Sequence, residues 1–274
     1  MTAAAKTMAR KSEPAPGRAE PEIEEAFDRL VGEGNDRLQR PLLSLCATAF
    51  LGGIDVAVGV LAYLLVDQQT GSKVLAALAF SIGFIALLLA RSELFTENFL
   101  VPVVAAAATP GSWLNLARLW VVTLVLNLLG GLVIATIAMV ALPELQATAI
   151  TSGSHYAHLG VSARSFCLAV LAGAVLTLMT RMQHATGSLG VKIVPAVVMP
   201  FLLVFGQLFH SVLDSILMFA GLATGHADYG WLDWLGALGW SAFGNIVGGL
   251  GLVTSIRLLR VTHRVAEERE QSPA

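Results

Sequence analysis

Long apolar runs separated by short polar connections occupy most of this chain. A helix needs about 20 apolar residues to cross a membrane, and six runs meet or approach that length. Polar and charged residues interrupt the second and fifth runs, and the fourth is the shortest. The predicted crossings are residues 42–66, 74–108, 116–142, 166–182, 193–223 and 234–259. The pattern predicts an all-α integral membrane protein with six transmembrane helices, of which the second and fifth are broken.

Both ends of the chain are polar. Residues 1–40 are predicted to be a tail that carries a short amphipathic helix, because Ile23, Phe27 and Leu30 recur at helical spacing. Gly32 and Gly34 are expected to end that helix. Residues 41–260 are predicted to form the transmembrane pore domain, and residues 261–274 a second polar tail. The first tail begins with a basic stretch that contains Lys6, Arg10, Lys11 and Arg18.

Composition and charge add an orientation to this picture. Only 13% of the 274 residues are charged, against roughly 25% in soluble domains. Of the 17 lysines and arginines, fourteen fall on the side that holds both termini. Cytoplasmic loops carry this excess, so both termini are expected in the cytoplasm and the protein in the inner or plasma membrane. The net charge of −2 gives no sign of nucleic-acid binding, and Cys46 and Cys167 lie within apolar runs as free thiols.

The two halves of the chain contain similar motifs in the same order. Gly-Gly after a polar residue is also common at membrane helix contacts, but a true repeat accounts better for the shared order and spacing. Three crossings per unit is an odd number, so the second unit must insert upside down, as in many transporters and channels. The paired motifs are Asn127–Gly131 with Asn245–Gly249, Leu94–Thr96 with Leu208–His210, and, more weakly, Ser44–Cys46 with Ser165–Cys167.

The interrupted crossings carry the candidate chemistry. Arg91, Glu93 and Glu97 lie within seven residues at membrane depth, where each charge costs roughly 2.5–3.5 kcal/mol on a lipid-facing helix. A break that turns these groups into protein or a water-lined cavity removes most of that cost. The fifth crossing likewise combines prolines, a glycine and polar side chains, namely Pro195, Pro200, Gly206, Gln207, His210, Ser211 and Asp214.

We predict that Thr96 and His210 meet near the middle of the membrane as a polar pair for a passing solute. Half-helix amide ends would add a positive field that attracts anions. The alternative for His210 is a structural histidine, and for Thr96 a hydroxyl bonded to its own helix. Arg91 with Glu93 or Glu97 is predicted to be a structural ion pair or an anchor of the break. Apolar constrictions that exclude hydrated ions are predicted at Phe80, Phe84, Leu94 and Leu203.

At these residues the chain resembles the formate/nitrite transporter family. The resemblance covers roughly residues 25–260, and it is specific because several motifs occur in order at the right spacing. The motifs are Glu93-Leu94-Phe95-Thr96, Ala-Phe-Leu-Gly-Gly at 49–53, Gly-Asn-Ile-Val-Gly-Gly at 244–249, and His210-Ser211-Val212 with Lys192 upstream.

The resemblance implies an aquaporin-like protomer of two inverted three-helix repeats, a homopentamer with one pore per protomer, and no cofactor. The family's solutes are small monovalent anions such as formate, nitrite, lactate and hydrosulfide. By this likeness Thr96 and His210 form the central pair, and Leu94 and its aromatic neighbours form the gates. A proton passed from or through His210 would let a weak acid cross as the neutral molecule, because burying a carboxylate costs more than burying its acid.

With its departures from the family pattern, the chain resembles a divergent, YfdC-like branch. Phe209 stands where the family has a glutamate before the histidine, and Asp214 and Gly173 stand in place of asparagines. Arg91 and Glu97 replace small residues, and the outer loop offers only His155, His158 and Arg164 in place of a lysine. Glu97 and Asp214 favour an alternative function, a pore of the same fold for a small cation or neutral solute.

Two further classes of function fit the sequence less well. A membrane enzyme would need a metal cluster or a nucleophile with a base, and the chain shows neither at membrane depth. His155 and His158 have the spacing of a metal pair, although surface histidines in a loop explain them as well. A purely structural or sensory membrane protein would not need two broken helices. Transport of a small solute across the bilayer is the predicted function.

Overall fold

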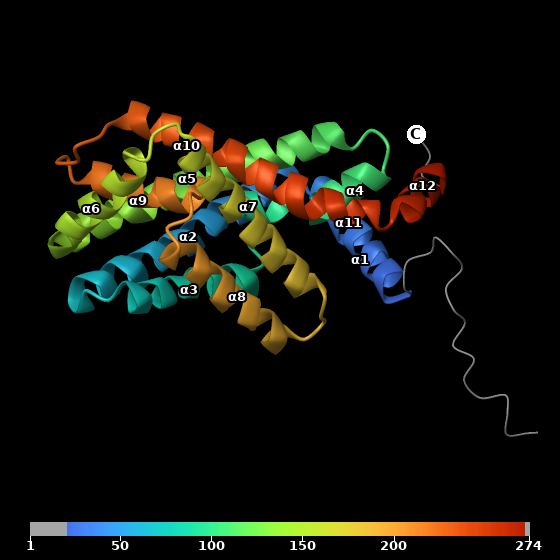
Figure 1. The fold of residues 1–274 in the computed structure, drawn as a ribbon, viewed down its shortest axis with the longest axis horizontal. Coiled ribbons are helices and arrows are strands. Elements are labelled where there is room, and N and C mark those ends of the chain that lie inside the picture. Colours follow the sequence, from blue (N-terminus) through green and yellow to red (C-terminus); the bar gives the residue numbers. More distant parts are fainter. Residues whose placement is uncertain (1–20, 272–274) are drawn as a thin grey trace, which may run out of the picture.

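The computed structural model describes the chain from residue 21 to residue 271, so the basic stretch predicted at the start of the chain lies outside the described residues. Between those residues the chain forms helices joined by short loops and contains no strand (Figure 1). The helices are α1 (Pro21–Leu38), α2 (Leu42–Thr70), α3 (Lys73–Ala90), η2 (Phe95–Phe99), α4 (Val101–Ala108), α5 (Trp113–Ala141), η3 (Pro143–Leu145), α6 (Gln146–Ala157), α7 (Ala163–His184), α8 (Leu189–Phe205), α9 (Ser211–Ala223), α10 (Trp231–Ile246), η4 (Val247–Thr254), α11 (Ser255–Leu259) and α12 (Thr262–Gln271).

These helices form the six predicted crossings. Within the described residues, five helices are long and apolar enough to cross a membrane, the last being α10, η4 and α11 joined as one rod. The second crossing is divided between α3 and α4. The fifth is divided between α8, with 17 residues, and α9, with 13. At 1.5 Å per residue neither half spans the roughly 30 Å hydrocarbon core alone, so the two halves together make one crossing.

Each break is a short non-helical segment. Arg91 ends α3 in the left-handed conformation, with φ of 55°, and residues 92–94 run on to η2. Gln207 has φ of 48°, and residues 206–210 connect α8 to α9. The prolines of the fifth crossing, Pro195 and Pro200, remain inside α8. The break in the fifth crossing therefore lies at the glycine and the polar residues, and not at the prolines.

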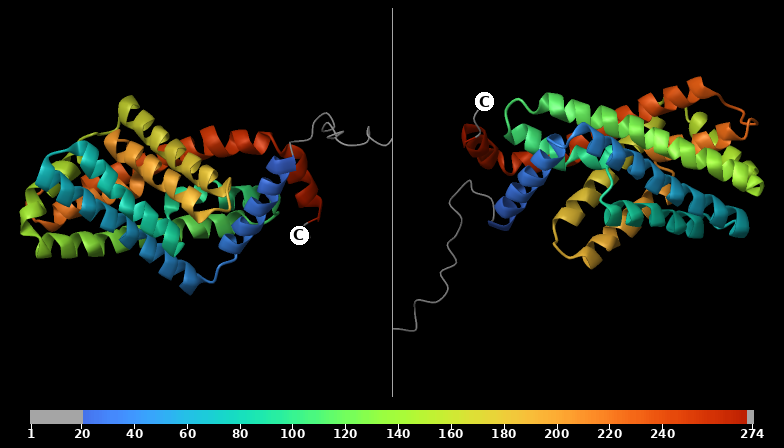
Figure 2. Two further views of the ribbon diagram at one scale, coloured as in Figure 1. Left: turned by 90° about the horizontal axis from the view of Figure 1, so that it is seen from below. Right: turned by 180° about the vertical axis from the view of Figure 1, so that it is seen from behind.

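α1 is longer than predicted, because Gly32 and Gly34 lie inside it. The reason is packing against α4: a Cβ added to Gly34 would meet the Cβ of Ala105 and the carbonyl oxygen of Val101. The glycine therefore permits close approach of two helices and does not end one. Figure 2 shows α1 lying across the same end of the molecule as α12, and Val261 joins the apolar cluster between them.

In each half of the chain a glycine allows two helices to pack closely, and the two contacts are equivalent. A Cβ added to Gly53 of α2 would overlap the carbonyl oxygen of Asn127 in α5, and one added to Gly173 of α7 would overlap that of Asn245 in α10. Only hydrogen fits at either position. The two contacts match one another, so the close approach is a property of the repeat.

We expect Gly53→Ala and Gly173→Ala each to lower the free energy of unfolding by about 1–3 kcal/mol, the usual cost of overpacking a tight contact. Thermal unfolding of the purified protein in detergent measures the effect. Gly236→Ala is the matched control, because a Cβ there meets nothing within 4 Å. Equal unfolding temperatures for all three variants would show that the helices can move apart at these contacts without loss of stability.

Candidate functional site

The break in the second crossing is held by one buried asparagine of α5. The Oδ1 atom of Asn127 accepts a hydrogen bond from the Phe95 amide at 2.9 Å. Its Nδ2 atom donates to the carbonyl oxygens of Ala49 at 2.7 Å and Glu93 at 2.8 Å. The Glu93 amide donates in turn to the carbonyl oxygen of Thr48. Backbone groups that a helix would have paired are thus satisfied within protein, as a non-helical segment at membrane depth requires.

The break in the fifth crossing repeats this arrangement. Asn245 of α10 accepts from the Ser211 amide at 3.0 Å and donates to the carbonyl oxygens of Ala169 and Phe209, both at 2.9 Å. The Phe209 amide donates to the carbonyl oxygen of Leu168. Asn127 and Asn245 thus make matching contacts in the two halves, which agrees with the prediction of two inverted repeats. Each asparagine ties the break of its own half to the neighbouring helix.

These contacts correct the alignment of the repeat. Because the asparagines bind Glu93 and Phe209 alike, Leu94 and not Thr96 is the counterpart of His210. Both residues are also the N-caps of the helices that follow the breaks. The predicted pairing of Ser44 with Ser165 is also one residue out of register, because the asparagines bind the carbonyl groups of Ala49 and Ala169 alike. Thr96 and His210 therefore come from non-equivalent positions.

The structure brings the side chains of Thr96 and His210 into contact. Thr96 Oγ1 lies 2.9 Å from His210 Nε2, and both residues are fully buried. Thr96 belongs to the short helix after the first break, and His210 is the last residue of the second break. The two broken crossings therefore meet at this pair.

The backbone fixes the form of the His210 ring. The Leu213 amide donates to Nδ1 at 3.0 Å, so Nδ1 carries no proton. A neutral ring then bears its proton on Nε2, which donates to the Thr96 hydroxyl. Asp214 completes the cap of α9: its Oδ2 atom accepts from the His210 amide at 2.6 Å. The carboxylate of Asp214 thus holds the break, and only Oδ1 has no partner among the described residues.

Two hollows lie along the divided crossings, one near each end of α3. The first, which we call the α1 hollow, has a volume of about 460 Å³ and includes Arg91 and Glu97 among the residues of its wall. The second, the α6 hollow, has a volume of about 430 Å³ and is lined by residues of α6, by the end of α8 with Gln207 of the break, and by Leu217 of α9. α3 contributes Lys73 to the α6 hollow and Leu87 to the α1 hollow, roughly 20 Å apart at 1.5 Å per residue.

The predicted pairing of Arg91 with Glu93 or Glu97 is not what the structure shows. Glu93 Oε1 lies 2.7 Å from Arg40, and its Oε2 lies 3.5 Å from Arg37. Both partners belong to α1 or to the residues just after it, so the N-terminal helix supplies the charges that neutralise a buried carboxylate. Arg91 anchors the end of α3 and faces the α1 hollow.

The α6 hollow holds two residues that sequence reasoning missed. Lys73, at the start of α3, lines it together with His155, whereas His158 and Arg164 do not. Tyr156 lines the same hollow, and its ring stacks on Phe209 at 6.1 Å between centroids. Lys73 could have been found from its position next to the second crossing on the less basic side. No carboxylate lines this hollow among the described residues.

The predicted constriction residues lie in the apolar core between the hollows. Phe80, Phe84, Leu94 and Leu203 are all fully buried and belong to one cluster. The rings of Phe80 and Phe84 pack at 5.7 Å between centroids, on the part of α3 between Lys73 and Leu87. That they constrict a path between the two hollows stays a prediction.

One acidic residue of the first crossing was also overlooked. Asp55 lies in α2, near Ser92 at the break of the second crossing. Its Oδ2 atom is buried and has no hydrogen-bond partner among the described residues. A carboxylate in the middle of an apolar run was the available signal, because ionisable groups at membrane depth mark functional or structural sites.

An ion pair ties α1 to the end of α7. His184 Nε2 lies 3.0 Å from Glu33 Oε2. This hydrogen bond, helped by the charge of Arg37, lowers the pKa of Glu33 from 4.5 to about 2. A carboxylate with a depressed pKa stabilises the folded form above its free pKa and loses that contribution as pH falls through the folded value. The contact therefore acts at neutral pH and fades between about pH 4.5 and 2.

We expect Glu33→Gln to loosen α1 at pH 7 by about 0.2–1 kcal/mol, the range for exposed pairs, since 43% of the Glu33 side chain is exposed. Hydrogen exchange of the α1 amides should accelerate up to about fivefold, with α5 unchanged. Asp36→Asn, on the exposed side of the same helix, is the control. The difference between wild type and Glu33→Gln should shrink as pH falls from 4.5, and a constant difference would contradict the assigned pair.

Comparisons with known proteins agree with this geometry. A family model described as formate/nitrite transporter matches residues 24–259. The inner membrane protein YfdC of Escherichia coli (strain K12) is 26% identical over 256 residues, which cover 89% of this chain and 80% of YfdC. The uncharacterized transporter YrhG of Bacillus subtilis (strain 168) is 31% identical over 121 residues, or 41% of this chain and 44% of YrhG.

Two solved structures share the fold. A pentameric formate channel with formate bound superposes with a TM-score of 0.67 at 23% identity, covering 79% of this chain and 96% of the channel. An ion channel of the FNT family superposes with a TM-score of 0.69 at 15% identity, covering 85% of this chain and 96% of the channel. The aquaporin-like arrangement of two inverted three-helix units with broken second and fifth helices is therefore the fold of this chain.

Proposed function

The chain belongs to the formate/nitrite transporter family and is a multi-pass membrane transport protein, not an enzyme, and from that premise we propose that it conducts a small monovalent anion or its protonated acid. The observation that supports the proposal is the contact between Thr96 and His210. This pair lies within apolar core between two hollows, and it offers hydrogen-bond donors where a solute has shed its water.

The two side chains, and not the helix amides, provide the direct contacts in this proposal. The amides of Ser211, Leu213 and Asp214 at the start of α9 already have partners. The positive field of the helix start remains and favours negative charge. The donors in this proposal are the hydroxyl proton of Thr96 and the Nε2 proton of His210, which turns from Thr96 to the solute when the solute enters. A carboxylate or nitrite oxygen accepts from both.

Proton coupling takes a specific form in this proposal. Nδ1 of His210 is occupied as an acceptor from Leu213, so the ring is neutral and has one proton. Losing that proton near neutral pH would leave an imidazolate, which is far too basic to form. The ring therefore donates a hydrogen bond, and the weak acid carries its own proton across the apolar core, where its neutral form is much less costly to bury.

Assembly and orientation are part of the proposal. The solved structure of a pentameric formate channel supports a homopentamer with one path in each protomer. YfdC is described as an inner membrane protein, which supports the inner or plasma membrane for this chain. The excess of lysine and arginine supports cytoplasmic termini, with the α1 hollow on the cytoplasmic side. The partners are then the solute, the bilayer and other copies of the chain.

A pore for a small cation or neutral solute remains the second candidate, and Glu97 favours it. This carboxylate lines the α1 hollow next to the start of the path. The basic side chains of the same wall oppose it, since Arg37, Arg40, Arg91 and Lys192 also line that hollow. Asp214 argues for neither solute, because it caps α9.

Uptake into proteoliposomes tests the proposal. Labelled formate, nitrite and methylammonium are supplied in turn, with and without a pH gradient, to the purified full-length protein in lipid. We expect formate and nitrite to enter faster when the outside is acidic, and methylammonium to be excluded. Entry of methylammonium alone would establish the cation alternative, and no entry of any solute would reject a small-solute pore.

At a pH at which Glu97 is ionised, we expect Glu97→Gln to raise formate uptake about two- to fivefold. The substitution then removes a like charge from the mouth of the path at an effective dielectric constant near that of a protein surface. The same variant should lower methylammonium uptake if the pore conducts cations. Glu144→Gln is the matched control, since Glu144 is exposed and lies in η3, away from the α1 hollow. Unchanged formate uptake in Glu97→Gln would place this carboxylate outside the path.

A further inference from the structure

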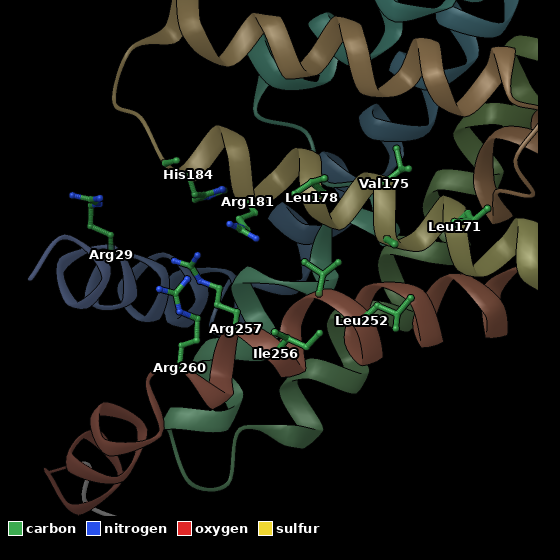
Figure 3. A pocket seen from close by; sticks show the side chains of 13 residues that line it. Arg29, Leu171, Val175, Leu178, Arg181, His184, Leu252, Ile256, Arg257 and Arg260 are labelled. Carbon is green, nitrogen blue, oxygen red and sulfur yellow. The ribbon is translucent and has the colours of Figure 1, made fainter. Parts of the chain in front are cut away.

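A third cavity lies on the outer surface of the helical bundle and shares only His184 with the α1 hollow. It has a volume of about 700 Å³ and lies between α7 and the last crossing. Figure 3 shows its two walls: Leu171, Val175 and Leu178 project from α7, and Leu252 and Ile256 from η4 and α11. Nothing in the proposed transport path uses these residues.

One end of this groove is strongly basic. Arg181, Arg257 and Arg260 gather there, with Arg29 of α1 beside them (Figure 3). Arg257 lies near enough to Arg181 and Arg260 for both of their charges to repel its own. The residues that line the groove include no carboxylate. The nearby Glu33 is held by His184 and Arg37.

The rest of the groove is apolar and open. Leu171 is 51% exposed, Leu252 53% and Ile256 56%, on helices that cross the membrane. An occupant must therefore carry negative charge at one end and apolar surface along its length. From Leu171 to Arg181 the α7 wall runs about 15 Å at 1.5 Å per residue, which is half of the roughly 30 Å hydrocarbon core. That is the depth of one leaflet.

We propose that this groove binds one anionic phospholipid. Its phosphate lies among Arg29, Arg181, Arg257 and Arg260, and an acyl chain lies along α7 and η4. Basic pockets between transmembrane helices bind acidic head groups by this combination of charge and apolar wall. A free phosphate would leave the apolar wall uncovered, and a second copy of the chain would have to bring carboxylates to the four arginines.

Lipid binding to the delipidated full-length protein, followed by native mass spectrometry, tests the proposal. The probes are phosphatidylglycerol and phosphatidylcholine with identical acyl chains, and inorganic phosphate in large excess as a competitor. The test variant is Arg257→Gln with Arg260→Gln. The control is Arg164→Gln with Arg269→Gln, which loses the same charge at exposed positions outside the groove.

We expect one phosphatidylglycerol to be retained in preference to phosphatidylcholine and not displaced by phosphate. Each arginine near an anionic lipid contributes about a factor of five in affinity, so the test variant should bind about 25-fold more weakly and the control as wild type. Equal retention of both lipids, equal binding by the test variant, or displacement by phosphate would each overturn the proposal.

A cysteine cross-linking measurement separates a lipid from a second copy of the chain. Leu252→Cys is introduced into a background in which Cys46 and Cys167 are replaced by serine, and the protein is oxidised in lipid vesicles. We expect the cysteine to form no disulfide between chains and to react with a lipid-soluble maleimide, with reaction slowed by added phosphatidylglycerol. An efficient disulfide between two chains would show that a second copy covers the groove and would reject the lipid site.

Discussion

His210→Asn should lower formate uptake at least about tenfold while leaving the fold intact. The asparagine side chain is a good N-cap and can accept the Leu213 amide in place of Nδ1, so α9 keeps its start. What it lacks is the reach of Nε2 to Thr96, 2.9 Å away in the wild type. A hydrogen bond to an ion is worth about 1.5–3 kcal/mol, and about 1.4 kcal/mol is a factor of ten. Uptake into proteoliposomes gives the rate, and thermal unfolding reports the fold.

The pH profile of the same variant separates two roles of the ring. If the acid carries its own proton, the residual uptake of His210→Asn still rises as the outside becomes acidic. Loss of that pH dependence would instead show that the ring relays the proton. Thr96→Ser, which keeps the hydroxyl, should retain most of the uptake, and Thr96→Val should resemble His210→Asn. Wild-type rates in both His210→Asn and Thr96→Val would remove the pair from the path.

Asn127→Leu and Asn245→Leu should each destabilise the protein by about 3 kcal/mol or more. Leucine has a similar size, but it leaves two buried backbone groups of the break without a partner, one amide and one carbonyl, at a cost of about 1–3 kcal/mol each. Total stability is only about 5–15 kcal/mol, so poor recovery of folded oligomer is the expected result. Size-exclusion chromatography and thermal unfolding in detergent measure it.

Two comparisons sharpen this result. Asn115→Leu makes the same chemical change at an exposed position of α5 and should melt as the wild type does. Asn127→Asp keeps the acceptor for the Phe95 amide but removes both donor bonds, so it should also be destabilised. If Asn127→Leu and Asn245→Leu melted with the control, water would have to satisfy the breaks, and the asparagines would not hold them.

Much of the fold was predictable because the bilayer restricts what a sequence can do. Hydrocarbon about 30 Å thick requires long apolar helices, so the apolar runs predicted six crossings with ends close to those observed. Charge is costly in lipid, so Arg91, Glu93 and Glu97 were enough to indicate a break in the second crossing. The paired Asn-Gly-Gly motifs identified the repeat, because such contacts need small residues and a polar anchor.

The partners of these residues could not be predicted, because contacts between distant segments leave no local pattern. α1 supplies Arg37 to Glu93, and Arg40 just after it supplies a second charge. The amphipathic pattern of α1 predicted only a helix at the membrane surface or against the bundle. Gly34 has the pattern of a helix end, yet it permits close packing on α4. The true counterpart of His210 is Leu94, which only the hydrogen bonds of the two asparagines reveal.

Six membrane crossings, in two inverted halves that each contain a broken helix, follow from the order of residues alone. The penalty of lipid for charge and for unpaired backbone groups is local, so it is expressed in local composition. Folding in three dimensions settles which groups meet across the breaks: the Thr96–His210 pair at 2.9 Å, the ring form imposed by Leu213, and the arginine-lined groove beside α7. Those features depend on distances between segments that are far apart in the sequence. Helix packing sets these distances, and no local stretch of sequence predicts them.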